Sequence, residues 1–372
     1  MSTSVQTPGT TLRDRFVKLA EMVTTPLLPA DYLDVISPLR SGADLRGRVV
    51  AIHPETRDAV TVVIRPGRGW RRHVPGQYIR IGVDVDGVRQ WRAYSLTSPV
   101  DRPDGCITIT VKAIPDGTVS NYLVRRACPG MIVQLDQATG EFTLPAVRPA
   151  KVLFITAGSG ITPVMGILRN FSMVGGGEPI DGIDVVLVHS APTSDDVVFA
   201  GELRMLAAQG RIRLVEQHTD TDGLLDPDQL CDLVPDVAER ETWACGPAGL
   251  LDTLEERWSA DGIAERLHVE RFRPTVLVTG EGGTVTFSRT GTALECDGAT
   301  PILDAGEEAG MLMPSGCRMG ICFGCVVPLR EGAVRDLRNG AITTAAPHES
   351  GDGGVPIQTC VSAAAGTCDI DL

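Results

Sequence analysis

Residues 317–325 read Cys317-Arg318-Met319-Gly320-Ile321-Cys322-Phe323-Gly324-Cys325, and one further cysteine follows in Ile357-Gln358-Thr359-Cys360. The spacing C-x4-C-x2-C with a distant fourth cysteine is typical of chains that hold a 2Fe–2S cluster through four thiolates. Zinc motifs, the main alternative, pair C-x2-C with a second C-x2-C or with histidines. We therefore predict one-electron redox chemistry at a cluster held by Cys317, Cys322, Cys325 and Cys360.

Length and composition restrict the class of protein. A chain of 372 residues, 43% of them hydrophobic and 22% charged, is expected to form about two or three globular domains. No apolar run approaches the roughly 20 residues that cross a bilayer, and the N-terminus lacks the apolar core of a signal peptide. We expect a cytoplasmic monomer with reduced cysteines. The net charge of −13 argues against a nucleic-acid partner.

The texture of the sequence changes along the chain. Residues 1–45 form an N-terminal extension with a helix-like apolar spacing from Leu12 to Val23. Short β-branched runs over 46–148 predict an antiparallel β-barrel. Over 149–275, apolar strands alternate with helical stretches, which predicts a parallel sheet with helices on both faces. A linker at 276–283 leads to a strand-rich segment, 284–372, that contains the four motif cysteines.

Two motifs in the β-rich segment suit a flavin nucleotide. Alternation along Arg92-Ala93-Tyr94-Ser95 sends Arg92 and Tyr94 to the same side of a strand, where they offer a cation and a flat ring. The turn Gly117-Thr118-Val119-Ser120 precedes a helix whose amino end can accept pyrophosphate oxygens. Either motif alone is weak, but their order ahead of a nucleotide-binding pattern favours a flavin site.

That pattern is Gly158-Ser159-Gly160-Ile161-Thr162-Pro163, which follows the apolar strand 151–157. Two glycines permit a tight turn close to a pyrophosphate, and proline suits the first turn of the next helix. A second motif, Cys245-Gly246-Pro247, closes a later strand at the carboxyl end, where open sheets bind ligands.

The choice between NADH and NADPH stays open at this stage. The strand 185–189 is followed by Ser190-Ala191-Pro192. Arginine near this point would pair with the 2′-phosphate of NADPH. An acidic residue here would bind the ribose hydroxyls of NADH. The sequence places neither immediately after the strand.

With these motifs in this order, the chain resembles the ferredoxin–NADP reductase superfamily. Within it, the chain looks most like iron–sulfur flavoprotein reductases with flavin, pyridine-nucleotide and ferredoxin domains in that sequence. The resemblance covers about residues 46–372 and implies a β-grasp fold for the C-terminal domain. Some relatives use FMN, and the turn Gly117–Ser120 favours FAD over FMN as the flavin. By the resemblance, Arg92 binds flavin phosphate, Tyr94 lies against the isoalloxazine and Ser95 lies near its N5. The other implied flavin contacts are Ala93, Val111, Lys112, Gly117, Thr118, Val119 and Ser120.

The resemblance also implies roles around the nicotinamide. It places Cys245 beside the C4 atom, lets Glu270 poise the site and lets Phe272 cover the flavin. Ser95, Cys245 and Glu270 are therefore the candidate catalytic residues. The implied nucleotide contacts are Gly158, Ser159, Gly160, Thr162, Pro163, Ser190, Cys245, Gly246 and Pro247.

We expect electrons to pass from NAD(P)H through FAD to the cluster and on to an external protein. The segment Thr24-Thr25-Pro26-Leu27-Leu28-Pro29 with Asp31-Tyr32-Leu33 resembles reductases that serve membrane fatty-acyl desaturases in actinobacteria. This favours a membrane di-iron desaturase or alkane hydroxylase as acceptor, with the reductase at the inner face of the membrane through that partner. A Rieske-type ring or steroid hydroxylase is the alternative acceptor. A redox carrier or sensor without turnover is the alternative of another class.

Overall fold

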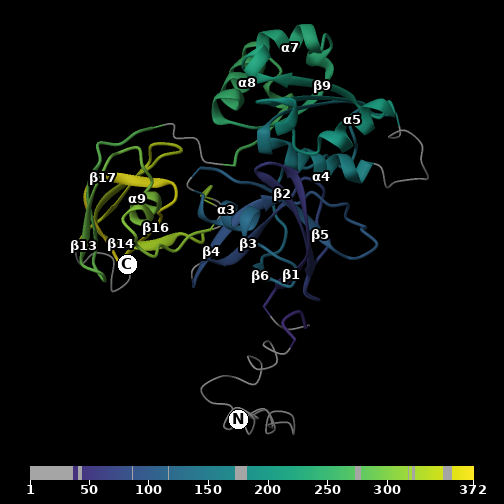
Figure 1. The fold of residues 1–372 in the computed structure, drawn as a ribbon. Coiled ribbons are helices and arrows are strands. Elements are labelled where there is room, and N and C mark those ends of the chain that lie inside the picture. Colours follow the sequence, from purple (N-terminus) through teal and green to yellow (C-terminus); the bar gives the residue numbers. More distant parts are fainter. Residues whose placement is uncertain are drawn as a thin grey trace, which may run out of the picture.

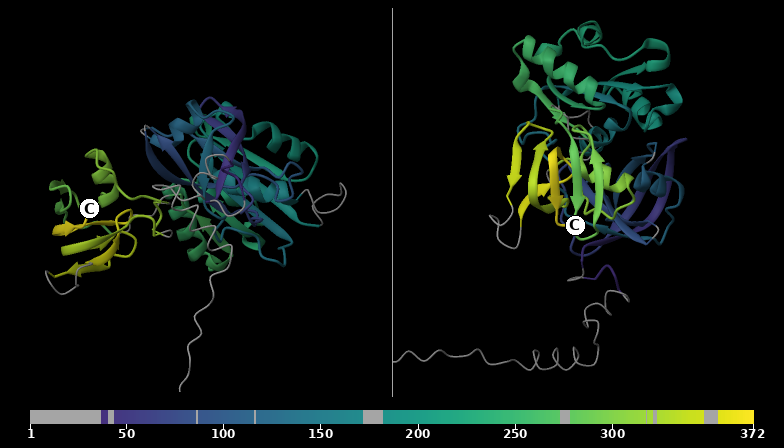
Figure 2. Two further views of the ribbon diagram at one scale, coloured as in Figure 1. Left: turned by 90° about the horizontal axis from the view of Figure 1, so that it is seen from below. Right: turned by 90° about the vertical axis from the view of Figure 1, so that its left-hand side faces the viewer.

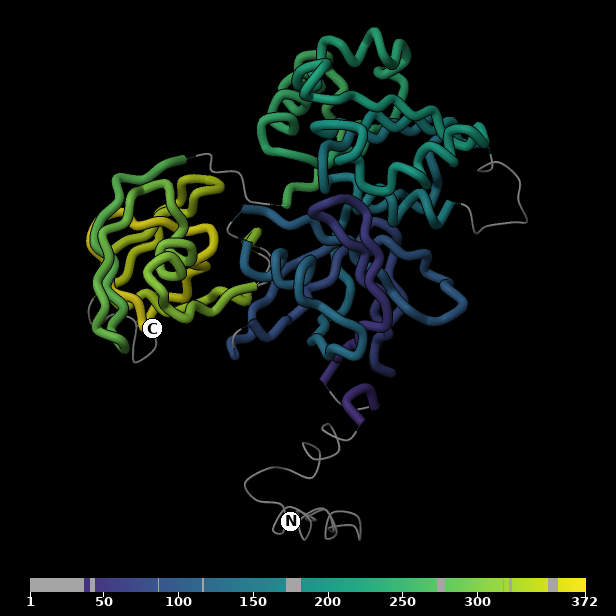
Figure 3. The backbone as a smooth tube through the Cα atoms, viewed as in Figure 1, coloured from purple at the N-terminus to yellow at the C-terminus, as the bar shows by residue number. Residues whose placement is uncertain are grey.

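The computed structural model of the chain describes residues 37–40, 44–85, 87–115, 117–171, 182–272, 278–316, 318–320, 323–346 and 354–372. These residues form three bodies along the chain (Figure 1). The backbone trace in Figure 3 passes from a β-rich body through an α/β body to a small C-terminal body beside the first. The helix expected over 12–23 and the desaturase-reductase-like motif over 24–33 lie outside the described residues.

The first body is an antiparallel barrel. Its strands are β1 (Arg46–Thr56), β2 (Ala59–Pro66), β3 (Tyr78–Val85), β4 (Val88–Ser95), β5 (Ile107–Lys112) and β6 (Ile132–Leu135), in the order β4-β3-β6-β1-β2-β5. The ends of this sheet meet because Leu96, directly after β4, bridges Ile109 of β5. Helix α3 (Thr118–Arg125) contributes Val119 and Leu123 to the barrel core. The predicted barrel is confirmed.

The second body is a five-stranded parallel sheet in the order β11-β10-β7-β8-β9. The order reverses between β7 and β10, so the carboxyl ends of these two strands form the position at which such sheets bind ligands. The strands are β7 (Lys151–Ala157), β8 (Asp184–Ala191), β9 (Arg213–His218), β10 (Glu241–Cys245) and β11 (Leu267–Glu270).

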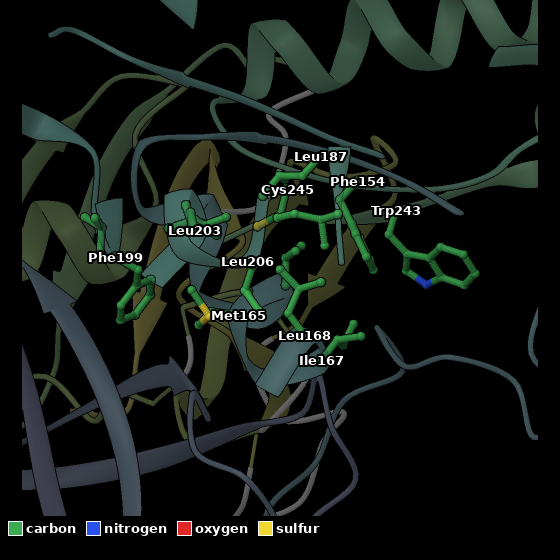
Figure 4. Packing of buried hydrophobic residues seen from close by; sticks show 14 of the residues in the cluster. Phe154, Met165, Ile167, Leu168, Leu187, Phe199, Leu203, Leu206, Trp243 and Cys245 are labelled. Atoms are coloured by element: carbon green, nitrogen blue, oxygen red, sulfur yellow. The ribbon is translucent and has the colours of Figure 1, made fainter. Parts of the chain in front are cut away.

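Helices cover both faces of this sheet, as predicted. One core packs residues of α4 (Ile161–Phe171) and α5 (Ala200–Ala208) on one face, and a second core packs α7 (Pro227–Leu233) and α8 (Ala248–Ala260) on the other. Figure 4 shows Cys245 among the side chains of the first core. The short elements are α6 (Thr219–Asp222), η1 (Gly158–Gly160), η2 (Ser194–Asp196), η3 (Val237–Glu239) and η4 (Ala264–Arg266).

The C-terminal body is a mixed sheet in the order β13-β12-β17-β14-β15, with β16 paired to β14. Its centre is the parallel pair β12 (Gly283–Phe287) and β17 (Ser362–Ile370). Helix α9 (Ile302–Glu308) packs Ile302 and Leu303 into its core. The other strands are β13 (Thr292–Cys296), β14 (Val326–Asp336), β15 (Ile342–Ala345) and β16 (Val355–Gln358). The left view of Figure 2 shows this body as a separate module beside the barrel.

The backbone entering this module is already bound to it at residue 278. The N–H of Val278 donates to the carbonyl of Leu337, and that of Gly280 donates to the carbonyl of Gly298 at 2.6 Å. Strand β12 begins at Gly283, so the segment expected as a linker over 276–283 packs on the module from 278 onward. Among the described residues, no helix has the length and apolar character needed to span a membrane.

Helix α4 joins the barrel to the parallel sheet. The guanidinium of Arg169 donates to the carbonyl of Thr97 at 2.7 Å and pairs with Glu202 of α5 at 2.6 Å. Asn170 accepts from the N–H of Val100 at 2.8 Å. Gly166 faces the same segment, since a Cβ atom there would lie 2.2 Å from the carbonyl oxygen of Leu96. The exit of β4 is thereby fixed to the helix that follows the glycine turn.

We predict that Gly166→Ala destabilises the protein through this contact. The added methyl meets a backbone oxygen that side-chain rotation cannot move, and such overpacking costs about 1–3 kcal/mol. The thermal unfolding midpoint should fall and flavin should be released more easily. Gly201→Ala in α5 is the control, because nothing lies within 4 Å of its added methyl. An equal effect of the two substitutions on the unfolding midpoint would contradict the close contact between Gly166 and the Leu96 carbonyl.

Candidate functional site

A row of polar side chains crosses the carboxyl edge of the parallel sheet. Strand register aligns Glu270 with Cys245, Cys245 with Thr156, Thr156 with His189, and His189 with Glu216. Aligned residues of parallel strands point to the same face of the sheet. The row therefore brings Cys245 and Glu270, which were predicted separately from two distant motifs, next to each other.

The titratable side chains of this row from Glu270 to His189 are uncharged at neutral pH. Burial raises the pKa of Glu270 to about 8, so its carboxyl keeps a proton at neutral pH. Burial, and then the charge of Glu270, raises the pKa of the Cys245 thiol well above its ordinary value. Burial also lowers the pKa of His189 to about 4, and its Nδ1 lies 2.8 Å from the Thr156 hydroxyl. Cys245 is thus a buried thiol suited to packing against a ligand, and not a thiolate nucleophile.

Two buried polar atoms in the row, Glu270 Oε2 and His189 Nε2, make no hydrogen bond within the described residues. Unpaired polar atoms of this kind are costly in a folded protein and often mark a ligand site. A protonated Glu270 can donate to an amide or ribose oxygen. The residues present therefore fit a pyridine nucleotide at this edge.

The glycine turn fits a nucleotide for steric reasons. Gly158 has φ +54°, in the left-handed region that favours glycine. A Cβ on Gly160 would lie 2.0 Å from the carbonyl oxygen of Cys245, so only glycine lets the turn approach the end of β10. The Thr162 hydroxyl closes the turn by donating to the Ser159 carbonyl at 2.9 Å, and Pro163 is buried in the first turn of α4.

The remaining nucleotide positions differ in exposure. Gly246 is half-buried and Pro247 is exposed beyond β10, whereas Ser190 on β8 is buried. Phe272 follows β11 with its side chain 38% exposed. An exposed aromatic ring is available to a planar ligand, and its covering of a flavin stays a prediction.

The flavin-motif residues lie on β4 and at the start of α3. Arg92 donates to the carbonyl of its neighbour Trp91 at 2.8 Å, and burial raises the pKa of the Tyr94 hydroxyl well above its ordinary value. Ser95 is buried at the end of the strand.

Other candidate flavin contacts lie on β4 and β5 of the barrel. Ala93 lies between Arg92 and Tyr94 on β4, and Val111 of β5 lies in the barrel core. Lys112 already pairs with Asp58 at 2.8 Å, so its contact with a flavin pyrophosphate stays a prediction.

The turn before α3 has the form of an anion-binding helix start. Thr118 is the exposed first residue of the helix, and Val119 points into the core. Ser120 Oγ donates to the Gly117 carbonyl at 3.2 Å. A Cβ on Gly117 would lie 2.4 Å from that same Oγ, so a larger residue would displace this hydroxyl. The amino end of a helix attracts phosphate oxygens, and a flavin pyrophosphate fits this turn.

The cluster motif is described in part. Cys325 and Cys360 lie with their sulfur atoms 3.1 Å apart, too far for a disulfide bond of about 2.05 Å and close enough to ligate one iron. Both side chains are buried. Soft thiolates of this kind suit an iron–sulfur cluster. Cys317 and Cys322 lie outside the described residues.

Arg318, a described residue of the cysteine loop (residues 317–325), lies near the flavin motif. Burial first, and then the nearby Arg318 guanidinium, lowers the pKa of Arg92, while Glu307 and Asp304 oppose this. Arg318 pairs with Asp304 at 2.7 Å and also with Glu307. In Figure 1 the C-terminal module, with α9, lies beside the barrel near β4. The two candidate redox sites therefore adjoin each other.

Comparisons with known proteins match all three bodies. The family of oxidoreductase FAD-binding domains matches residues 71–144, that of oxidoreductase NAD-binding domains matches 154–256, and that of 2Fe-2S iron-sulfur cluster binding domains matches 285–365. An NADPH oxidoreductase of Mycobacterium tuberculosis is 48% identical over 360 residues, which cover 95% of this chain and 91% of that protein.

The chain belongs to the ferredoxin–NADP reductase superfamily. The reductase component of the 3-ketosteroid-9-alpha-monooxygenase of Mycolicibacterium smegmatis is 30% identical, with 77% of this chain and 86% of that protein covered. The structure of phthalate dioxygenase reductase shares the fold, at a TM-score of 0.58 and 21% identity, and covers 88% of this chain and 97% of its own. This superfamily member therefore has FAD-binding, NAD-binding and 2Fe–2S cluster-binding domains and is an oxidoreductase, as predicted.

Sequence reasoning missed a cation beside the nucleotide edge of this reductase. Arg204 of α5 donates to the hydroxyl of Ser194, just beyond β8, at 2.7 Å, and to Glu216 of β9 at 2.8 and 2.7 Å. His218, at the end of β9, lies 3.5 Å from Glu216. No arginine directly follows β8 in the sequence, whereas the fold supplies one from the next helix, α5.

We predict a pH-dependent stability that depends on Glu270. An ordinary glutamate ionises near pH 4.3 in the unfolded chain, whereas the buried group stays protonated to about pH 8. In this window the native state binds the extra proton, so the unfolding free energy falls as the pH rises toward the native pKa. Thermal scans from about pH 5 to about pH 9 should show this fall, on the order of a few kcal/mol.

Glu270→Gln stays neutral and should flatten the dependence, becoming more stable than the unsubstituted protein at the alkaline end. Glu265→Gln is the control: it removes an exposed carboxyl of the same module, and its stability should depend on pH as that of the unsubstituted protein does. A parallel pH profile for Glu270→Gln and the unsubstituted protein would refute the buried, protonated state.

Proposed function

We propose that this protein is an NADPH-dependent reductase that passes electrons singly to an external oxygen-activating protein. The observation that carries the proposal is the adjacency of its parts: the Cys245–Glu270 pair, the β4 flavin motif joined to α4, and the cysteine loop beside Arg92. FAD accepts an electron pair from a pyridine nucleotide and can release single electrons to a 2Fe–2S cluster.

The residues of the chain act by positioning. The glycine turn before α4 receives the nucleotide pyrophosphate, and the neutral Cys245 thiol packs against the nicotinamide ring. Protonated Glu270 offers a hydrogen bond at the same edge. Ser95 lies at the end of β4, and its position relative to the turn is fixed because the following residues are bound to α4.

We propose NADPH as the preferred donor because Arg204 and Ser194 lie beyond β8. An arginine and a hydroxyl held together at 2.7 Å can both donate to a 2′-phosphate. Glu216 orients the guanidinium, and its own pKa is lowered chiefly by its bond with Arg204. The similarity to an NADPH oxidoreductase supports this choice.

Arg204→Leu should raise the KM for NADPH about 10- to 100-fold, since a charge-assisted hydrogen bond contributes about 1.5–3 kcal/mol. The KM for NADH, which lacks the phosphate, should change little. Arg213→Gln, at an exposed arginine of β9, is the control. Equal losses with both donors for Arg204→Leu would contradict recognition of the 2′-phosphate.

For the acceptor, we propose a membrane di-iron desaturase or alkane hydroxylase, supported by the motif at residues 24–33. The second candidate is a Rieske-type or steroid monooxygenase, favoured by the 30% identity to a 3-ketosteroid-9-alpha-monooxygenase reductase component. Reconstitution of the full chain with one enzyme of each kind separates the two candidates. Product formation should be fast with the true acceptor, where electron delivery does not limit the rate, and slow with the other enzyme.

Cys325→Ser should separate the two halves of the electron route. With FAD bound, the variant should still reduce ferricyanide from NADPH, because the flavin and nucleotide motifs are intact. It should fail to support the oxygen-activating acceptor, since one ligand of the cluster is lost. Cys231→Ser, at an exposed cysteine outside the motif, should support it normally. Normal support by Cys325→Ser would show that electrons leave by another route.

A further inference from the structure

Arg338 connects the two segments that contain the described cysteines. Its Nη1 donates to the carbonyl of Gly320, in the cysteine loop, at 3.1 Å. Its Nη2 lies 3.3 Å from Oε1 of Gln358, which precedes Cys360 by two positions. One side chain, from the residues directly after β14, thus binds both parts of the candidate cluster site.

The loop is shaped around this guanidinium. Gly320 has φ +72°, and a Cβ atom there would lie 2.4 Å from Nη1 of Arg338. The same Gly320 carbonyl accepts a second hydrogen bond, from Nε2 of Gln358 at 2.9 Å. The positive φ favours glycine, a Cβ atom would displace the guanidinium, and the guanidinium packs directly against the loop backbone.

A carboxylate fixes the guanidinium in place. Nε and Nη2 of Arg338 donate to the two oxygens of Asp336 at 3.0 and 2.7 Å. The hydrogen bond to Asp336 chiefly raises the pKa of Arg338, and the neighbouring Cys360 and Cys325 add to the rise. The arginine is thus a permanent cation within electrostatic reach of both thiols.

A fixed cation beside a cluster acts on its reduction. Adding an electron to the cluster adds negative charge, which a nearby cation stabilises more in the reduced state than in the oxidised state. Charge and hydrogen bonding around the sulfurs are among the factors that set the potential of iron–sulfur centres. The negative charge of the Asp336 carboxylate disfavours the added electron, so Arg338 and Asp336 have opposite effects on the reduction potential.

We propose that Arg338 raises the reduction potential of the cluster held by Cys325 and Cys360, and that Asp336 positions the guanidinium and partly offsets its charge. The inference rests on the proposed function, since it requires the cluster to bind at these cysteines. It makes Arg338 a positioning and tuning residue that controls how readily the flavin passes an electron onward.

The test is a potentiometric titration of the full-length protein, monitored by the EPR signal of the reduced cluster. Arg338→Gln keeps a hydrogen-bond donor for Gly320 and removes the charge. It should lower the potential by the equivalent of about a tenfold change in the one-electron equilibrium constant, which is about 59 mV. Arg338→Lys keeps the charge and should stay closer to the unsubstituted protein.

Asp336→Asn removes the opposing charge and should move the potential upward. The two neutralising substitutions therefore have opposite expected signs, whereas a purely structural role of the pair predicts no such opposition. Arg289→Gln is the matched control, because it removes a cation of the same module that pairs with Asp371. It should change the equilibrium constant less than twofold.

The outcomes separate the inference from the proposed function. A shift of less than threefold for Arg338→Gln, or a fall in potential for both Arg338→Gln and Asp336→Asn, would overturn the tuning role while leaving the cluster assignment intact. If Arg338→Gln loads no cluster, Asp336→Asn decides: a rise in potential supports the tuning role, and an unchanged or lower potential overturns it. Absence of a 2Fe–2S signal from the unsubstituted protein after anaerobic reconstitution would refute the proposed function itself.

Discussion

The arrangement of this reductase depends on the attachment of helix α4 to the chain leaving β4. Arg169 binds a barrel carbonyl with one nitrogen and the Glu202 carboxylate with the others, and it also stacks 4.8 Å from the centre of the Phe199 ring. These contacts join the barrel to the parallel sheet through a charged group that is mostly shielded from water. Because α4 begins at the glycine turn, the same helix fixes the flavin motif and the nucleotide motif relative to each other.

The sheet edge next to this helix favours neutral groups. A buried carboxyl with a raised pKa, a thiol that stays protonated and an imidazole that stays uncharged lie side by side. Desolvation is the common cause, since charged forms are costly away from water. Charge appears only farther along the edge, at Arg204 and Glu216, where solvent is nearer. The edge is thus divided into an uncharged end and a charged end that suit different parts of a dinucleotide.

Sequence alone supplied the features that depend on local spacing. The cysteine spacing indicated the C-terminal module, the glycine turn indicated the nucleotide-binding sheet, and alternation on β4 indicated the flavin strand. What it could not supply were contacts made by packing. Arg204 reaches the nucleotide edge from α5, and Arg338 reaches the cysteine loop from beyond β14, at separations that no motif records.

One such contact did leave a local signal. A glycine inside a helix costs about 1 kcal/mol relative to alanine, so Gly166 in α4 indicates a close approach by another backbone. The structure shows that approach at Leu96. The other half of the cluster site, Cys317 and Cys322, rests on spacing, and the ligand contacts of all the candidate flavin and nucleotide residues remain predictions.

The backbone contacts of residues 278–283 have a practical consequence for module exchange. Gly280 and Gly298 are packed so closely that a Cβ on Gly298 would lie 2.0 Å from the Gly280 carbonyl oxygen, and the N–H of Gly366 bonds to the Gly282 carbonyl. These residues are structurally part of the C-terminal unit. If the C-terminal module is transferred to another protein, the transferred segment should therefore start upstream of residue 278. A junction at Gly283, where β12 begins, would remove the backbone contacts that residues 278–282 make with the rest of the module.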